Sequence, residues 1–335
     1  MKRVPYVARA IVCGILMLHI SPQALGQGPG PARLFVFDDP FWLNLHHYLY
    51  VLGRAEAELP DSRRRAVAGA PADQAGGLTA LDEGEQRAWR TAVTTYAKGP
   101  SRRDVLFDGD MVSLGRTLIA AGDRTALDSK DIDPPIVDTL RRAAPLYRKA
   151  WWPNHERANQ ALIARLESDL AKYGQPILAF IVRAYQEPWP AKGYSVNIAA
   201  YANWAGAYSN TGGVLVVSSL DPAANEGLKG LEGIFHEAMH QWDDRVFAAL
   251  SAEARRQNAS VPDTLSHAMI FFTAGEAVRN VVPSHVPYAE AEGVWARGMG
   301  TLKPALESAW KPYLDGRGSR DEALTALVKA AAAPR

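Results

Sequence analysis

The chain has 335 residues, 47% of them hydrophobic, with 37 basic and 36 acidic side chains. This is enough apolar sequence for one large domain or two smaller ones. Because the charge is near neutral, no basic surface is expected, and we predict neither nucleic acid nor an anionic membrane as a partner. A single cysteine, Cys13, excludes a disulfide framework.

The first 26 residues are typical of a cleaved secretory signal peptide. Basic residues precede an apolar run at 10–20, and a short polar stretch then ends in small residues at Gly26. The run is short for a membrane-spanning helix, so we expect cleavage after Gly26, a secreted or periplasmic protein, and no membrane anchor. Removing residues 1–26 leaves 34 basic and 36 acidic side chains, a formal charge of −2, and no cysteine. Any bound zinc must then be held by His, Asp or Glu.

Residues 27–190 are predicted to form a mostly helical N-terminal region. Near its start, Phe41, Leu45 and Leu49 recur at four-residue steps, which is the period of an amphipathic helix. Further segments with helical periodicity follow at 84–98, 111–122, 135–152 and 155–174. No residue pattern in this region indicates chemistry.

Residues 191–335 are predicted to form a catalytic region with a helical C-terminal tail. Residues 194–209 and 212–219 are rich in β-branched and aromatic side chains and predict strands joined by a turn. Helical patterns then return at 225–250, 262–280 and 288–333. The fold class expected is therefore α+β, mostly helical, with a small sheet preceding the helices that carry the candidate site.

His236, Glu237 and His240 form a His-Glu-x-x-His motif in the helix predicted at 225–250. Residues four apart lie on one helix face, so the two imidazoles can bind one metal ion. Glu237 is turned aside from them, where its carboxylate can take a proton from water at the metal. The alternative is that both histidines are ordinary core or surface groups, because so short a pattern also arises by chance.

A third ligand is expected in the helix predicted at 262–280. An apolar stripe that includes Phe272 has Glu276 at its next position, and a carboxylate there is costly unless it is paired or metal-bound. We expect Glu276 to be a metal ligand; the alternative is an ion pair with Arg279. His267 lies about half a turn from Glu276 around this helix, so the two cannot readily serve one site, and we expect His267 to be structural.

These features resemble the gluzincins, the thermolysin-like zinc metallopeptidases, over about residues 194–280. The resemblance implies that Zn²⁺ is held by His236, His240 and Glu276, with Glu237 as the general base. It also implies that Asp244, four residues after His240, orients a histidine, with Asp243 as its near competitor.

The resemblance implies two further parts of the site. Asn280, four residues after Glu276, matches a position that orients a histidine ligand. An edge strand above the zinc would hold the substrate backbone, and its candidates are Ala205, Gly206, Ala207 and Tyr208.

The group that stabilises the oxyanion is not marked by a motif. Tyr288, His285 and Tyr208 are each possible, and we expect Tyr288 to have this role. The sequence thus predicts a secreted zinc-dependent metallohydrolase that acts as a peptidase on peptides or proteins. The alternative is a non-catalytic helical binding or scaffold protein in which the His-Glu-x-x-His motif is vestigial or accidental.

Overall fold

A computed structural model describes residues 33–57, 71–127, 130, 132–203, 206–210 and 213–332, and the expected signal peptide lies outside them. The strands are β1 (Phe35–Asp38), β2 (Tyr194–Ala199), β3 (Ala207–Ser209) and β4 (Leu215–Ser218). The helices and helical turns before β2 are α1 (Phe41–Glu56), α3 (Gln74–Leu78), α4 (Glu83–Lys98), η1 (Pro100–Arg102), α5 (Gly109–Ala121), α6 (Pro134–Ala150), α7 (Trp152–Asp169), η2 (Leu170–Gly174) and α8 (Gln175–Tyr185). Those after β4 are α9 (Pro222–Asn225), α10 (Lys229–Met239), η3 (His240–Trp242), α11 (Asp243–Arg256), α12 (Leu265–Val281), α13 (Tyr288–Ala291), η4 (Trp295–Met299), α14 (Leu302–Ala305), η5 (Leu306–Trp310), α15 (Lys311–Leu314) and α16 (Arg320–Ala331). The mostly helical α+β class is confirmed.

Local sequence explains where several helices begin. Asp82 Oδ1 accepts the amide N–H of Glu85, and Glu85 Oε2 accepts that of Asp82, each at 2.8 Å. Ser319 and Glu322 exchange the same pair of bonds at the start of α16. Such reciprocal caps satisfy amides that have no partner inside the helix, so these ends are set by residues close in sequence.

The sheet is mixed, with strand order β1-β2-β4-β3. β1 pairs with β2 and β2 with β4 in parallel, whereas β3 pairs with β4 antiparallel and lies at the sheet edge. Along β4, Leu215 and Val217 belong to one hydrophobic cluster and Val216 to a second. Because successive side chains of a strand point to opposite faces, the sheet separates the two clusters and is buried on both sides.

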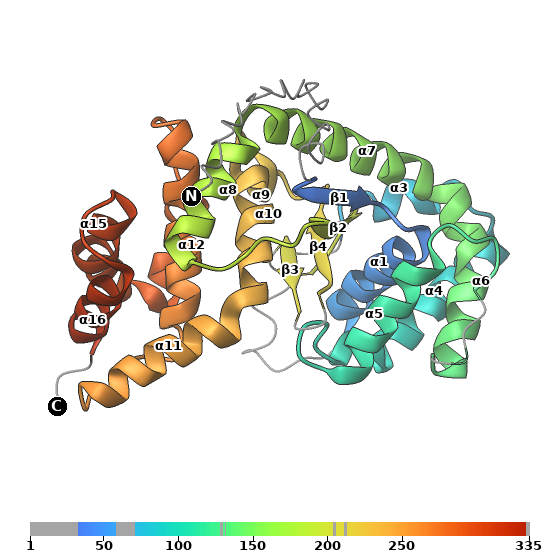
Figure 1. Cartoon of the computed structure of the whole chain (residues 1–335). Coiled ribbons are helices and arrows are strands. Elements are labelled where there is room, and N and C mark those ends of the chain that lie inside the picture. The colour runs from blue at the N-terminus through green and yellow to red at the C-terminus, as the bar shows by residue number, and fades with distance from the viewer. Residues whose placement is uncertain are drawn as a thin grey trace, which may run out of the picture. The chain divides into compact units, whose positions relative to one another are not determined.

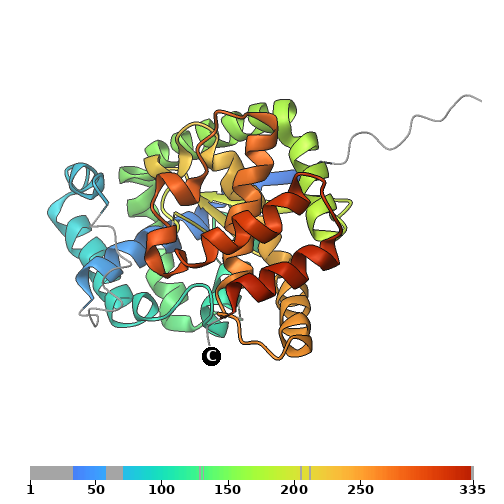
Figure 2. The ribbon, with the colours of Figure 1, turned by 90° about the vertical axis from the view of Figure 1, so that its left-hand side faces the viewer.

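One cluster contains side chains of α1, α4, α5 and α6, and the other contains side chains of α8, α10, α11, α12 and the C-terminal helices. Figure 1 shows α1 and α5 on one side of the sheet and α10 and α12 on the other. In Figure 2 the C-terminal helices α15 and α16 lie over α12. The helices that carry the motif are therefore held between the sheet and the C-terminal helices.

The boundary expected near residue 190 does not divide these clusters. Strand β1, which the sequence did not indicate, pairs with β2 across that boundary, and α8 packs with α12 in one cluster. By its internal contacts, Arg33–Arg335 is one compact unit. No helix in the described part of the chain is long and apolar enough to cross a membrane.

The helix expected at 225–250 is broken at the motif. α10 ends at Met239, a 3₁₀ turn (η3) takes His240–Trp242, and α11 starts at Asp243. A 3₁₀ turn is wound more tightly than an α-helix, so it shifts the direction of side chains after Met239. This turn places His240 and Asp243 in the geometry described next.

Candidate metal centre

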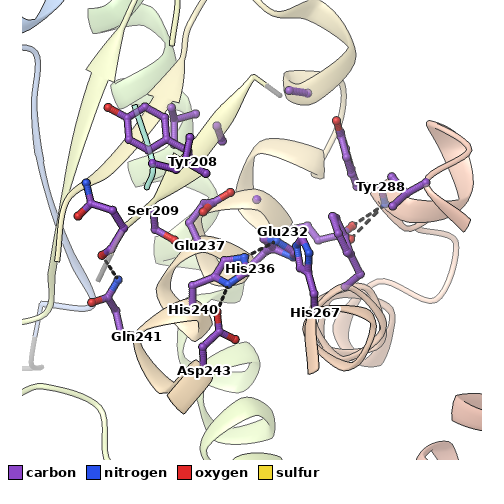
Figure 3. Close-up of a pocket in the computed structure, with 18 of the residues that line it drawn as sticks. Tyr208, Ser209, Glu232, His236, Glu237, His240, Gln241, Asp243, His267 and Tyr288 are labelled. Atoms are coloured by element: carbon purple, nitrogen blue, oxygen red, sulfur yellow. Dashed lines mark hydrogen bonds and ion pairs between the residues drawn. The ribbon is translucent and has the colours of Figure 1, made fainter. Parts of the chain in front are cut away.

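A cavity of about 950 Å³ opens beside the motif. Its walls include residues of β3, α10, η3 and α12, together with residues that precede or begin α5. Figure 3 shows the polar side chains that gather in it, with His236, His240 and His267 at their centre. A concave site with several convergent polar groups is the usual form of a ligand-binding or active site.

Three histidines, from α10, the turn η3 and α12, meet in this cavity. Nε2 of His236 lies 3.1 Å from Nε2 of His240. His267, on α12, adds a third imidazole, and one ring nitrogen from each of the three lies within 4.8 Å of the others. The structure therefore brings His236 and His240 together as the motif predicted, and α12 supplies a third nitrogen donor.

The His240 ring is oriented by Asp243. Its Nδ1 lies 2.6 Å from Asp243 Oδ2, and a carboxylate there accepts the Nδ1 proton and leaves the Nε2 lone pair facing His236. Burial disfavours the charged ring, but the bond to Asp243 and the Glu237 carboxylate outweigh it and raise the pKa of His240. Asp243 thus occupies the orienting role that the sequence assigned to Asp244.

The other two imidazoles are held in an apolar setting that keeps them neutral. Burial, followed by the proximity of His240, lowers the pKa of His236 and lowers that of His267 to about 4. The ring of Phe271 covers both, with centroids 4.1 Å from His236 and 4.7 Å from His267. A neutral imidazole has a free lone pair, which is the form that binds a metal.

Glu237 lines the same cavity and is only 7% exposed. In Figure 3 its side chain lies between Ser209 and His236. Burial raises the pKa of Glu237, while the nearby His240 and the Ser209 hydroxyl oppose the rise. A carboxylate with a raised pKa beside a group of metal-binding nitrogens is suited to accept a proton near neutral pH.

Glu276 does not join the histidines, which corrects its expected role as the third ligand. Its Oε1 lies 3.0 Å from Arg279 Nη1 and its Oε2 lies 2.8 Å from Lys311 Nζ, so both oxygens are engaged by cations. Glu276 is not among the residues that line the cavity. The physical reason is that α12 turns this face toward the C-terminal helices, where Lys311 neutralises the carboxylate, and turns His267 toward α10.

The two residues that were predicted to orient a histidine, Asp244 and Asn280, are both exposed. Asp244 lines the cavity but is exposed, and the carboxylate that binds His240 is that of Asp243. Asn280 is exposed near the end of α12 and does not line the cavity. Neither residue therefore holds a histidine ring in the way that the resemblance implied.

The predicted substrate strand consists of the first two residues of β3 and the two residues before it. Ala207 and Tyr208 line the cavity, together with Ser209, whereas Gly206 does not. Ala205 lies outside the described residues. The Tyr208 hydroxyl lies 3.0 Å from His47 Nε2 and is therefore committed to helix α1. Because β3 is an edge strand of the sheet, its outer backbone groups have no partner strand among the described residues.

Tyr288 lines the cavity and is placed by Glu232, a buried residue one turn before His236. Glu232 accepts the Tyr288 amide N–H at 2.9 and 3.1 Å and lies 2.6 Å from His285 Nε2. Burial raises the pKa of Glu232, against the opposing effects of His285 and the Tyr288 amide. In Figure 3 the Tyr288 hydroxyl points away from the histidines, so its role at an oxyanion stays a prediction.

Sequence reasoning expected His267 to be structural, placed Asp243 behind Asp244, and did not single out Glu232. His267 has Phe271 four residues later on the same helix face, and this pair of aromatic rings was the signal that α12 turns a second face toward a site. Asp243 could have been preferred only with knowledge of the turn at His240. Glu232 carried the simplest signal, because it is an acid four residues before His236 and so lies on the same helix face.

Comparison of the chain with protein-family models, with curated proteins and with solved structures finds no match.

Proposed function

We propose that this protein is a zinc-dependent hydrolase that cleaves peptide bonds, with His236, His240 and His267 as the metal ligands and Glu237 as the general base. The observation that carries the proposal is the meeting of three imidazoles and one buried carboxylate in one cavity. The gluzincin resemblance supports the motif alone, since the third ligand expected from it lies elsewhere.

The donor set fits zinc. Nitrogen ligands at about 2.0–2.1 Å from one zinc ion stand roughly 3–3.5 Å apart, and the two motif nitrogens are 3.1 Å apart. Three protein ligands leave one position open, which is the pattern of catalytic rather than structural zinc. When bound there, zinc supplies a Lewis acid that polarises a carbonyl group and makes water more acidic.

The residues of the chain itself have distinct tasks in this proposal. Asp243 holds His240 in the tautomer that points Nε2 to the other imidazoles. Phe271 and the buried setting keep His236 and His267 unprotonated. Glu237 takes a proton from the attacking water and can return it to the leaving amine.

A peptide substrate is supported by β3. An extended chain can add to the free edge of a sheet through its own backbone, a known mode of peptide recognition. β3 lies at such an edge and its side chains line the cavity that holds the histidines. A backbone bound there would run past the Glu237 carboxylate.

The test is the metal content and activity of matched variants. We expect one equivalent of zinc in the protein, loss of zinc in His240→Ala and His267→Ala, and retention of zinc in Glu237→Gln. On a mixed peptide library, Glu237→Gln should cleave at least about 100-fold more slowly, because loss of a general base costs about 10²–10⁴ in rate.

Two results would contradict the proposal in different ways. Protein that takes up no zinc, even when zinc is supplied, would mean that the histidines are structural. Protein that binds zinc through these residues but cleaves no peptide would favour the alternative of a non-catalytic binding protein.

A further inference from the structure

One side chain on the wall of the cavity is far more exposed than a phenylalanine usually is. Phe107 is 85% exposed, whereas the other exposed large hydrophobic residues in the described part of the chain reach at most 54%. Single exposed apolar residues are common and need no explanation by themselves. Phe107 differs because it lies on the wall of the cavity that holds the three histidines.

The segment that carries Phe107 is fixed by hydrogen bonds. Asp104 Oδ1 accepts the amide N–H groups of Leu106 and Phe107 at 2.8 and 3.3 Å. Arg103 reaches over the segment to Asp108 with two bonds of 2.8 and 2.6 Å, and its carbonyl accepts the Tyr50 hydroxyl at 2.8 Å. The backbone around Phe107 is thus bound at both ends.

The two residues before Phe107 contact the core beneath them. Val105 is 4% exposed in the core beneath, and Leu106 packs against the same cluster. The segment therefore buries Val105, whereas the half-buried Leu106 and the exposed Phe107 both line the cavity. A ring held outside a core on a fixed backbone can gain contacts from a ligand with little loss of conformational freedom.

The rest of the cavity continues this apolar surface. Val112 on α5 lines it beside Leu106 and Phe107, and Phe271, Val294 and Met299 line it from the C-terminal half of the chain. These residues come from both sides of the expected boundary at residue 190, so the helical N-terminal region contributes directly to the candidate site. The N-terminal region supplies an apolar part of the wall of the cavity that holds the histidines.

We propose that Phe107, with Leu106 and Val112, forms a subsite that receives an apolar side chain of the peptide substrate, an inference that rests on the proposed function. Peptides that carry a large apolar residue are thereby preferred over those with only small or charged ones. The preference comes from contact with the ring of Phe107 and from removal of both apolar surfaces from water.

The experiment separates binding from cleavage. In the Glu237→Gln protein, loaded with zinc, the affinity of two blocked pentapeptide amides, Ala-Ala-Phe-Ala-Ala and Ala-Ala-Ala-Ala-Ala, is measured by titration calorimetry. We expect the phenylalanine peptide to bind about tenfold more tightly, within the range of discrimination that apolar pockets achieve. Adding Phe107→Ala should reduce this ratio to about two or less.

Phe247 provides a matched control. It is 50% exposed on α11 and does not line the cavity, so Phe247→Ala should leave the ratio of affinities unchanged. A ratio that survives Phe107→Ala, or equal binding of the two peptides before substitution, would overturn the subsite. If the ratio of affinities depends on Phe107 but the unsubstituted protein cleaves no peptide, the subsite stands and the proposed hydrolase activity is overturned instead.

Discussion

Replacing Glu276 by glutamine should destabilise the fold and leave zinc binding intact, the reverse of what a metal ligand would show. Both carboxylate oxygens of Glu276 are bound to cations, Arg279 at 3.0 Å and Lys311 at 2.8 Å, and its side chain is 10% exposed. Glutamine keeps the volume and one acceptor oxygen but loses the charge. The change therefore tests the ion pairs with little effect on packing.

The size of the effect follows from what the cations retain. Removing one partner of a fully buried pair costs about 3–5 kcal/mol, whereas an exposed pair contributes about 0–1 kcal/mol. Arg279 keeps an ion pair with Glu290 at 3.0 Å, and Lys311 keeps one with Asp315 at 2.9 Å. Their side chains are 34% and 38% exposed, so solvent screens part of the loss. We expect a loss of about 1–3 kcal/mol in the free energy of unfolding.

The assay pairs urea unfolding of the chelated protein with zinc titration of the folded protein. Glu276→Gln should lower the unfolding midpoint and bind zinc as the unsubstituted protein does. His267→Ala, on the same helix, is the matched comparison, and should weaken zinc binding. Loss of zinc in Glu276→Gln with an unchanged midpoint would show that the assignment of His267 over Glu276 is wrong.

Three further tests, each based on one or two substitutions, address the packing, the orientation of the ligands and the pH dependence. Gly275→Ala would place a Cβ 2.6 Å from a proline side-chain carbon, so thermal unfolding should show that the free energy of unfolding falls by about 1–3 kcal/mol. Gly115→Ala, where the new Cβ meets open space, should raise it by roughly 0.5–1 kcal/mol. Asp243→Asn should weaken zinc binding about 10–100-fold in a competition titration, and Asp244→Asn should not. Burial lowers the pKa of His47 from 6.5 to about 4, so the unfolded chain binds more protons between these values and stability falls as the pH falls. The free energy of unfolding lost through His47 at pH 4 is on the order of 3 kcal/mol. Urea midpoints measured against pH should therefore fall less steeply in His47→Gln, and an equally steep fall would refute the role given to His47.

What the sequence determined by itself was local. The pairing of His236 with His240 follows from the helical period, and the structure brings their nitrogens to 3.1 Å. The strands β2 and β4 and the helix α1 follow from runs of residues whose period and composition suit one kind of element. The α+β class follows from these elements, because their order along the chain already limits how they can pack.

Only the tertiary structure decided which face of α12 meets the motif. Nearly every residue of this helix between Ala268 and Val278 is buried, so an apolar stripe cannot distinguish the face toward α10 from the face toward the C-terminal helices. The cation that neutralises Glu276 is Lys311, which is 35 residues away and can be placed only by the fold. The charge of Glu276 on an apolar stripe thus indicated that it is buried with a partner. Which partner it has depended on a residue far away in the sequence.

The same distinction holds for the remaining parts of the site. The turn at His240, which selects Asp243 over Asp244, depends on a local change of helix geometry that side-chain period does not encode. The approach of the segment at Phe107 to the histidines depends on β1 and β2 pairing across about 160 residues. Periodicity determines what a segment becomes, because it acts between near neighbours. Which segments share a cavity is decided by packing, because burial of apolar surface is non-directional and is satisfied only by the whole fold.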